Sequence, residues 1–148
     1  MSGERVLLTG ASGFVGRYLL RDLTARGYHV RTAGRGAGPD IPGVEHVAID
    51  DLGAPIDWQS LLDGVDHVVH SAGLAHADSA IPEERYQAVN AQATLALARA
   101  AQAAGVRRFV FLSSIRAQSG PVSDKALSEA DTPAPTDAYG RSKLAAEQ

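Results

Sequence analysis

The sequence predicts an α/β fold in which a parallel sheet is covered by helices on both faces. Short apolar runs of strand length alternate with segments of helical periodicity, and each run is almost continuously apolar, as in strands buried on both sides. A glycine-rich turn directly after the first run is the third observation. With 148 residues, of which 45% are hydrophobic, a single domain over residues 1–148 can form a core.

Five strands and four helices account for most of the chain. The strands are expected in the apolar runs RVLLTG (5–10), YHVRTAG (28–34), GVEHVAIDD (43–51), VDHVVHSAG (65–73) and RRFVFLSS (107–114). The helices are expected at 14–27, 58–64, 82–104 and 137–148. The stretch from 115 to 137 contains three prolines and several Ser and Asp residues, which indicates a long loop. Loops of that length inside a compact domain are usually functional.

Composition excludes several classes of protein. The net charge of −3 lacks the basic excess of a nucleic-acid binder, and the absence of cysteine excludes disulfides and thiolate metal sites. No apolar run reaches the roughly 18 to 20 residues of a membrane span, and the N-terminus has no signal-peptide pattern. We therefore expect a cytoplasmic protein that binds neither nucleic acid nor membrane. His67, His70 and His76 do not show metal-ligand spacing, so we expect no metal site.

The glycines of TGASGFVG stand between the first strand and the first helix, which is the context of a dinucleotide-binding loop in a Rossmann-type fold. Gly10 lets the chain turn out of the strand, Gly13 lets backbone N–H groups approach a pyrophosphate, and Gly16 lets the helix pack closely. The helix N-terminus then faces the anion. The alternative is a glycine-rich turn without a ligand; a P-loop is excluded because no Gly-Lys-Ser/Thr follows. The predicted cofactor-binding set in this loop is Gly10, Ser12, Gly13, Phe14, Val15 and Gly16.

The end of the second strand favours NADP over NAD. An NAD-binding fold usually places an acidic residue there to bind the ribose hydroxyls, but this chain has Gly34 followed by Arg35, and Arg31 lies in the strand itself. A guanidinium can pair with a 2′-phosphate, whereas a carboxylate would repel it. The alternative for Arg35 is a solvated loop arginine.

Near the end of the chain, Tyr139 and Lys143 are spaced to share one face of a helix. A phenol is a poor acid–base catalyst at neutral pH until a nearby ammonium group favours its phenolate form. Ser113 and Ser114 follow the fifth strand, at the end where ligands bind in open α/β sheets, and either hydroxyl could hold a substrate oxygen. Alone, the Tyr–Lys spacing is weak evidence, because a solvated helix face produces it too.

Together, TGASGFVG, DDL, VVHSAGLA, the Asn90 region, RRFVFLSS and YGRSK make the chain resemble the extended short-chain dehydrogenase/reductases, which include NAD(P)-dependent sugar-nucleotide epimerases and dehydratases. The resemblance covers essentially all of the chain. It implies that Ser114, Tyr139 and Lys143 are catalytic, with Tyr139 as acid–base residue and Lys143 also holding the nicotinamide ribose. It implies further cofactor contacts from Asp51, Leu52, Ser71, Ala72, Gly73, Asn90 and Tyr139.

The resemblance also narrows the range of possible reactions. Ile115 and Arg116 follow Ser114 where dehydratases usually carry Asp-Glu, so a dehydratase is disfavoured. Gln118 and Ser119 stand where many epimerases carry Tyr-Gly, which favours reductases and epimerases acting on nucleotide-linked N-acetyl sugars. Epimerase and ketoreductase both stay open.

Members of this family are longer than 148 residues, and a C-terminal lobe completes their nucleotide-sugar pocket. We therefore expect this chain to lack the C-terminal substrate lobe, to bind NADP or NAD, and to turn over sugar nucleotide poorly or not at all. A homodimer is expected for a full-length parent but not for these 148 residues alone. The alternative function is a non-catalytic dinucleotide-binding or redox-sensing module, which retention of Ser114, Tyr139 and Lys143 argues against.

Overall fold

The computed structural model describes residues 3–75, 78 and 80–148. His76 lies outside the described residues. The strands are β1 (Arg5–Thr9), β2 (His29–Gly34), β3 (Glu45–Ala48), β4 (His67–His70) and β5 (Arg108–Phe111). The helices are α1 (Phe14–Ala25), α2 (Trp58–Leu61), α3 (Glu83–Tyr86), η1 (Gln87–Gln92), α4 (Ala93–Ala103), α5 (Ile115–Gln118) and α6 (Ala138–Glu147).

All five strands pair in parallel in the order β3-β2-β1-β4-β5, which confirms the predicted Rossmann-type sheet. The order reverses between β1 and β4, where Thr9 is in register with His70. In open sheets of this kind, dinucleotides bind beyond the carboxyl ends of the strands at such a reversal. The residues that follow Thr9 and His70 therefore occupy the place where a cofactor is expected.

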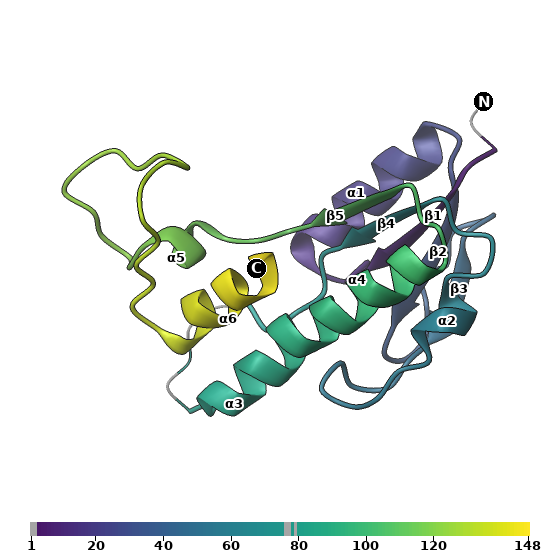
Figure 1. The fold of residues 1–148 in the computed structure, drawn as a ribbon. Coiled ribbons are helices and arrows are strands. Elements are labelled where there is room, and N and C mark those ends of the chain that lie inside the picture. The colour runs from purple at the N-terminus through teal and green to yellow at the C-terminus, as the bar shows by residue number, and fades with distance from the viewer. Residues whose placement is uncertain (1–2, 76–77, 79) are drawn as a thin grey trace. The chain divides into compact units, whose positions relative to one another are not determined.

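Neighbouring residues of β1 pack on opposite faces of the sheet, as the alternation of side chains in a strand requires. On one face, Leu7 packs with Val68 and with residues of α2 and α4, including Trp58 and Leu97. On the other face, Leu8 packs with α1. Figure 1 shows α1 and α4 on opposite sides of the sheet, so each face has its own apolar layer.

The described residues form two compact units. Unit 1 comprises residues 1–72 and 96–112 and contains the whole sheet, α1, α2 and most of α4. Unit 2 comprises residues 73–95 and 113–148 and contains α3, η1, the start of α4, α5 and α6. The prediction of one domain over 1–148 stays a prediction.

Two elements differ from the sequence prediction. The predicted helix over 82–104 forms from Glu83 to Ala103, but its middle, Gln87–Gln92, is a π-helix. The predicted loop over 115–137 begins with the short helix α5, because the Ser114 side chain accepts a hydrogen bond from the Arg116 N–H and so caps a helical turn. Pattern analysis misses both features, because each depends on where individual hydrogen bonds go rather than on periodicity.

Candidate active site

The glycine turn of unit 1 needs glycine at two of its three positions. Gly10 has φ +75°, and a Cβ there would stand 2.6 Å from the Ala72 nitrogen. A Cβ at Gly16 would stand 1.9 Å from the Gly10 carbonyl oxygen, so glycine lets α1 pack directly against the turn that leaves β1. A Cβ at Gly13 would meet only the Gly10 oxygen, at 3.2 Å, and otherwise points into space that a pyrophosphate could use.

The first turn of α1 follows Gly13, which has no side chain with which to cap the helix. Its N-terminal N–H groups therefore suit an anion. The remaining predicted loop residues, Ser12, Phe14 and Val15, are all exposed here, and Phe14 is 73% exposed. This cradle fits the diphosphate of a dinucleotide.

The ends of β1 and β4 are joined by side chains that the sequence analysis did not single out. The fully buried Thr9 hydroxyl lies 2.7 Å from His70 Nδ1 and accepts the Ala72 N–H at 3.2 Å. Ser71 Oγ donates to the Thr9 carbonyl at 2.8 Å. These bonds hold Ser71 and Ala72, two predicted cofactor residues, against the glycine turn. The signal that could have revealed Thr9 is its place immediately before Gly10.

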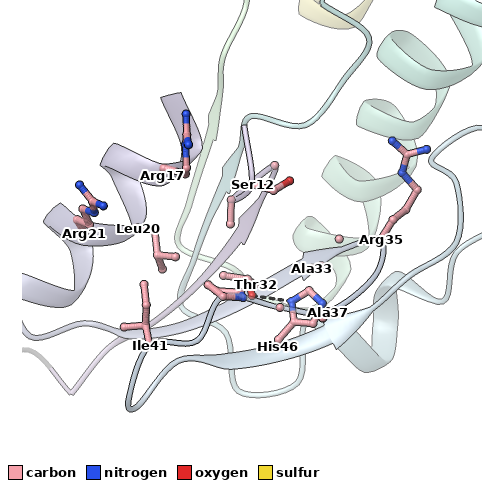
Figure 2. Close-up of a pocket in the computed structure, with 15 residues that line it drawn as sticks. Ser12, Arg17, Leu20, Arg21, Thr32, Ala33, Arg35, Ala37, Ile41 and His46 are labelled. Atoms are coloured by element: carbon pink, nitrogen blue, oxygen red, sulfur yellow. Dashed lines mark hydrogen bonds between the residues drawn. The ribbon is translucent and has the colours of Figure 1, made fainter. Parts of the chain in front are cut away.

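A pocket of about 360 Å³ lies beside the glycine turn, between α1 and the segment that links β2 to β3. Figure 2 shows Arg17, Leu20 and Arg21 on the α1 side, and Thr32 and His46 on the sheet side. None of the described residues that line it is acidic, whereas three are arginines: Arg17, Arg21 and Arg35. The pocket is thus suited to an anionic group next to a bound dinucleotide.

Arg35 lies at the rim of this pocket, directly after β2. Its side chain is 79% exposed and reaches within 3.9 Å of the Asp51 carboxylate. Asp51 also accepts the Gly53 N–H at 2.8 Å, and Leu52 packs on the core that α2 and α4 cover. Arg31 is committed elsewhere, since its guanidinium donates to the carbonyls of Leu61, at 2.7 Å, and Asp63. Of the two arginines in β2 and directly after it, Arg35 therefore lines the pocket and Arg31 does not.

In unit 2, α6 carries Tyr139 and Lys143 one turn apart, as predicted. Lys143 is only 6% exposed, and burial lowers the pKa of Lys143 to about 8, although the Glu147 carboxylate acts in the opposite direction. Tyr139 is half-buried, and its ring lies edge-on to that of the fully buried Tyr86, with centroids 6.3 Å apart. A buried ammonium group beside a phenol favours proton transfer at the phenol.

The start of α6 is fixed by Asp137 and Gly140. Asp137 accepts the Gly140 N–H at 2.7 Å and pairs with Arg116 of α5. Burial raises the pKa of Asp137, but the Gly140 N–H and the Arg116 guanidinium more than offset this, and the net shift is downward. A Cβ at Gly140 would stand 2.3 Å from the Arg116 carbonyl oxygen, so glycine after the tyrosine lets α6 pack tightly on α5.

Asn90 connects η1 to α6 and to the segment after β4. It is 1% exposed; its Oδ1 accepts the Leu74 N–H at 2.8 Å, and its Nδ2 donates to Ser142 Oγ at 3.0 Å. A Cβ at Gly73 would stand 2.7 Å from Asn90 Oδ1, so glycine is needed there. Asn90 thus supports the backbone of the segment after β4, and its contact with a cofactor stays a prediction. Ser142, which donates to the Tyr139 carbonyl at 2.7 Å, was missed by the sequence analysis.

The two serines after β5 have different partners. Ser114 Oγ caps α5 as an acceptor, so its hydroxyl hydrogen can still be donated. Ser113 Oγ donates to the Glu147 carboxylate. The assignment of Ser114 as the catalytic serine stays a prediction.

Over the described ranges, no three His, Asp or Glu side chains gather closely enough to hold a metal ion. Nor does any helix in that part of the chain have both the length and the apolar character needed to cross a membrane.

The sheet order, the glycine turn and the Tyr–Lys helix define a Rossmann-fold protein of the dehydrogenase/reductase type. The chain belongs to the NAD dependent epimerase/dehydratase family, whose model matches residues 6–148. It is 37% identical over 150 residues to the UDP-glucose 4-epimerase of Vibrio cholerae, covering 98% of this chain and 45% of that protein. It is 35% identical over 128 residues to the ceramide reductase of Caulobacter vibrioides, and that match covers 84% of this chain and 39% of the reductase.

Among solved structures, MoeE5 in complex with UDP-glucuronic acid and NAD matches with a TM-score of 0.86 and 35% identity. That match covers 97% of this chain and 47% of MoeE5. The chain thus spans less than half of the length of these relatives.

Proposed function

We propose that the chain forms the cofactor-binding and proton-transfer part of an NAD(P)-dependent enzyme that acts on a nucleotide-linked sugar. One observation carries the proposal: Tyr139 and a buried Lys143 share a helix that Asn90, Gly140 and Asp137 hold in place, in a chain that belongs to this family. A helix held by several partners is expected of a catalytic element rather than of a solvated face.

The residues present fit a nicotinamide dinucleotide. Gly10, Gly13 and Gly16 form the cradle for its diphosphate, and the α1 N-terminus faces that anion. A preference for NADP rests on Arg35 and on the pocket that it shares with Arg17 and Arg21. MoeE5 and other similar structures contain NAD, which supports a nicotinamide dinucleotide in general and leaves the NADP preference a proposal.

When bound, the dinucleotide accepts or supplies a hydride at the substrate carbon. Tyr139 as phenolate takes the hydroxyl proton when that carbon is oxidised, and as phenol returns a proton to the carbonyl oxygen when it is reduced. Lys143, mostly an ammonium group at pH 7 with a pKa of about 8, stabilises the phenolate. Ser114 donates a hydrogen bond to the same substrate oxygen. In an epimerase these residues would serve oxidation and then reduction of the same carbon, and in a ketoreductase reduction alone.

The substrate class is inferred from relatives. The similarity to a UDP-glucose 4-epimerase and to MoeE5, whose structures hold UDP-glucuronic acid or UDP-glucose, supports a nucleotide sugar. The similarity to a ceramide reductase shows that this level of identity spans other substrates as well. We further propose that the 148 residues bind dinucleotide but turn over sugar nucleotide poorly, and that a parent of full family length is a homodimer.

Calorimetric titration of this chain with NADPH and with NADH tests the cofactor site. Tighter binding of NADPH, lost in Arg35→Ala, supports the proposal; equal affinity, or tighter NADH binding, contradicts the preference, and binding of neither contradicts the cofactor site itself. Binding of NADPH alone does not separate an enzyme from a redox sensor.

Tyr139→Phe in a protein of full family length separates those two functions. An enzyme should lose about 10²- to 10⁴-fold in turnover of UDP-sugars, because the phenol transfers the proton. Its dinucleotide affinity should stay within about twofold, since one hydroxyl is removed and the glycine turn is unaltered. Turnover unaffected by Tyr139→Phe would contradict the role of Tyr139.

A further inference from the structure

His46 of β3 lies against the segment that carries Arg35. Figure 2 shows its ring beside Thr32 at the floor of the pocket, with the chain of residues 34–38 passing close to it. His46 Nε2 lies 3.1 Å from the Gly36 carbonyl oxygen, and Nδ1 lies 2.9 Å from Thr32 Oγ1. One imidazole therefore links a buried strand residue to the backbone just after Arg35.

The direction of these bonds follows from their partners. A carbonyl oxygen can only accept, so Nε2 carries the hydrogen that is donated to Gly36. In a neutral imidazole Nδ1 is then an acceptor, and the hydroxyl of the fully buried Thr32 donates to it. Thr32 Oγ1 also lies 3.3 Å from the Glu45 carbonyl, but a single hydroxyl hydrogen favours the shorter bond. Thr32 thus fixes the ring through Nδ1, and the ring holds the Gly36 carbonyl through Nε2.

Of the glycines in GRGAG, Gly38 packs directly against this ring. A Cβ at Gly38 would stand 2.2 Å from His46 Cγ and 2.3 Å from His46 Cβ, so any side chain there would displace the segment from the ring. A Cβ at Gly34 would stand 3.9 Å from His46 Cε1, and Gly36 has φ +73°, a conformation that favours glycine. His46 therefore contacts residues 34–38 at two points, the Gly36 carbonyl and Gly38, on the C-terminal side of Arg35.

We propose that His46 is a positioning residue that sets the preference between NADPH and NADH by holding residues 34–38 where they can receive a 2′-phosphate. The inference rests on the proposed function, since it assumes that a dinucleotide binds at the glycine turn. A 2′-phosphate is accommodated by an arginine just after the second strand, which is the residue that His46 holds in place. NADH carries a hydroxyl in place of the 2′-phosphate, and residues 34–38 offer no carboxylate to bind it, so the affinity for NADH should depend little on His46.

Four versions of the chain test this, each titrated calorimetrically with NADPH and NADH: unaltered, His46→Ala, His46→Gln and His46→Asn. Glutamine keeps a donor near the place of Nε2 for the Gly36 carbonyl, whereas asparagine can reach only Thr32. We expect His46→Ala and His46→Asn to weaken NADPH about 3- to 10-fold, the effect of one lost hydrogen bond, and NADH by less than about twofold. His46→Gln should stay close to the unaltered chain.

His29→Ala is the matched control, because His29 is exposed at the opposite end of β2 and should change neither affinity. If His46→Ala does not fold, as thermal unfolding would show, the glutamine–asparagine pair alone decides. An unchanged NADPH-to-NADH ratio in the alanine and asparagine variants, with binding retained, would overturn the role of His46. Failure of the unaltered chain to bind either dinucleotide is a separate result that would overturn the proposed function and this inference with it.

Discussion

The two units of the molecule differ in the kind of side chain that fills the interior of each. Unit 1 buries large apolar side chains on both faces of its sheet, among them Leu7, Leu8 and Leu97, each at 0% exposure. In unit 2 the buried apolar residues are mainly small, and polar side chains such as Asn90 and Lys143 are buried with them. Unit 1 therefore combines polar contacts with a large apolar core, whereas unit 2 has little apolar core and depends more on hydrogen bonds such as those of Asn90.

This difference bears on function. An apolar sheet supplies a rigid base for the glycine turn without restricting the charge of what binds there. The proton transfer proposed for α6 would need polar groups near this helix, and each buried polar group must then have a partner. Unit 2 should therefore respond more strongly to pH and to loss of single hydrogen bonds, and unit 1 to loss of side-chain volume.

The largest effect is expected from Leu97→Ala in α4. Truncating a fully buried leucine in the core of unit 1 should reduce the free energy of unfolding by about 2 to 5 kcal/mol. Urea unfolding followed by the fluorescence of Trp58, the single tryptophan, reports on this core. Leu95→Ala on the same helix is the control, because Leu95 is 46% exposed and should cost far less. Equal losses in both variants would contradict the apolar core of unit 1.

Asn90→Ala should have the largest effect in unit 2. The Leu74 N–H and the Ser142 hydroxyl would each lose a hydrogen bond from a buried partner, at a cost of about 1 to 3 kcal/mol. Hydrogen exchange should then increase over residues 74–75 and over α6 and leave β1 unchanged. Asn90→Asp is the matched variant, since it keeps the acceptor for Leu74 but loses the donor to Ser142. Protection of α6 unchanged in Asn90→Ala would show that these bonds do not hold unit 2.

Lys143→Met should stabilise the protein at pH 7 by on the order of 1 kcal/mol, because burial disfavours the ammonium form. With a folded pKa of about 8, below that of the unfolded chain, the unfolded state binds more protons from pH 8 upward. Stability of the unaltered chain should therefore rise from pH 8 to 10, and the methionine variant should show no such rise. Thermal unfolding measured over this pH range tests the prediction, and Lys125→Met at an exposed position is the control. If Lys143→Met lowers the stability at pH 7, the predicted direction of the effect is wrong.

Asp137→Ala should cost about 0.5 to 1 kcal/mol at pH 7, because α6 loses its N-terminal cap. The pKa of Asp137 is lowered in the fold, so its contribution is present above the ordinary carboxyl pKa and is lost as pH falls through the folded value. The variant and the unaltered chain should converge in acid. Asp137→Asn keeps a capping oxygen and separates the cap from the charge pairing with Arg116. A pH-independent difference between Asp137→Ala and the unaltered chain would contradict the lowered pKa of Asp137.

The sequence predicts the sheet of unit 1 well because apolar runs and glycines carry its signal locally. All five strands and α1 form close to where they were expected, and Gly10 and Gly16 have the steric roles that their spacing indicates. In unit 2 the sequence identifies Tyr139 and Lys143 through a recognisable motif but does not reveal Ser142 or Tyr86. The reason is that these residues act through contacts between segments far apart in the chain, as Ser142 with Asn90.

His46 was missed for a related reason. Its role depends on a ring packed under Gly38 and bonded to Gly36, in an adjacent but separate element. The glycines of GRGAG indicated a turn after β2, and nothing in a one-dimensional pattern says which side chain fills the space that they leave.

The π-helix of η1 has a consequence for insertions and deletions in this chain. A π turn amounts to one residue more than an α-helix needs, and each residue turns a helix by about 100°. Removing one residue from 87–92 should restore regular α-helical winding and keep Leu97 and Ala101 on the side of the helix that fills the core, because the wide turn absorbs the extra residue. A deletion of one residue in the regular part of α4 should instead rotate all that follows by about 100°. Residues 87–92 are therefore the place in this helix where chain length can change by one residue without changing which side faces the core.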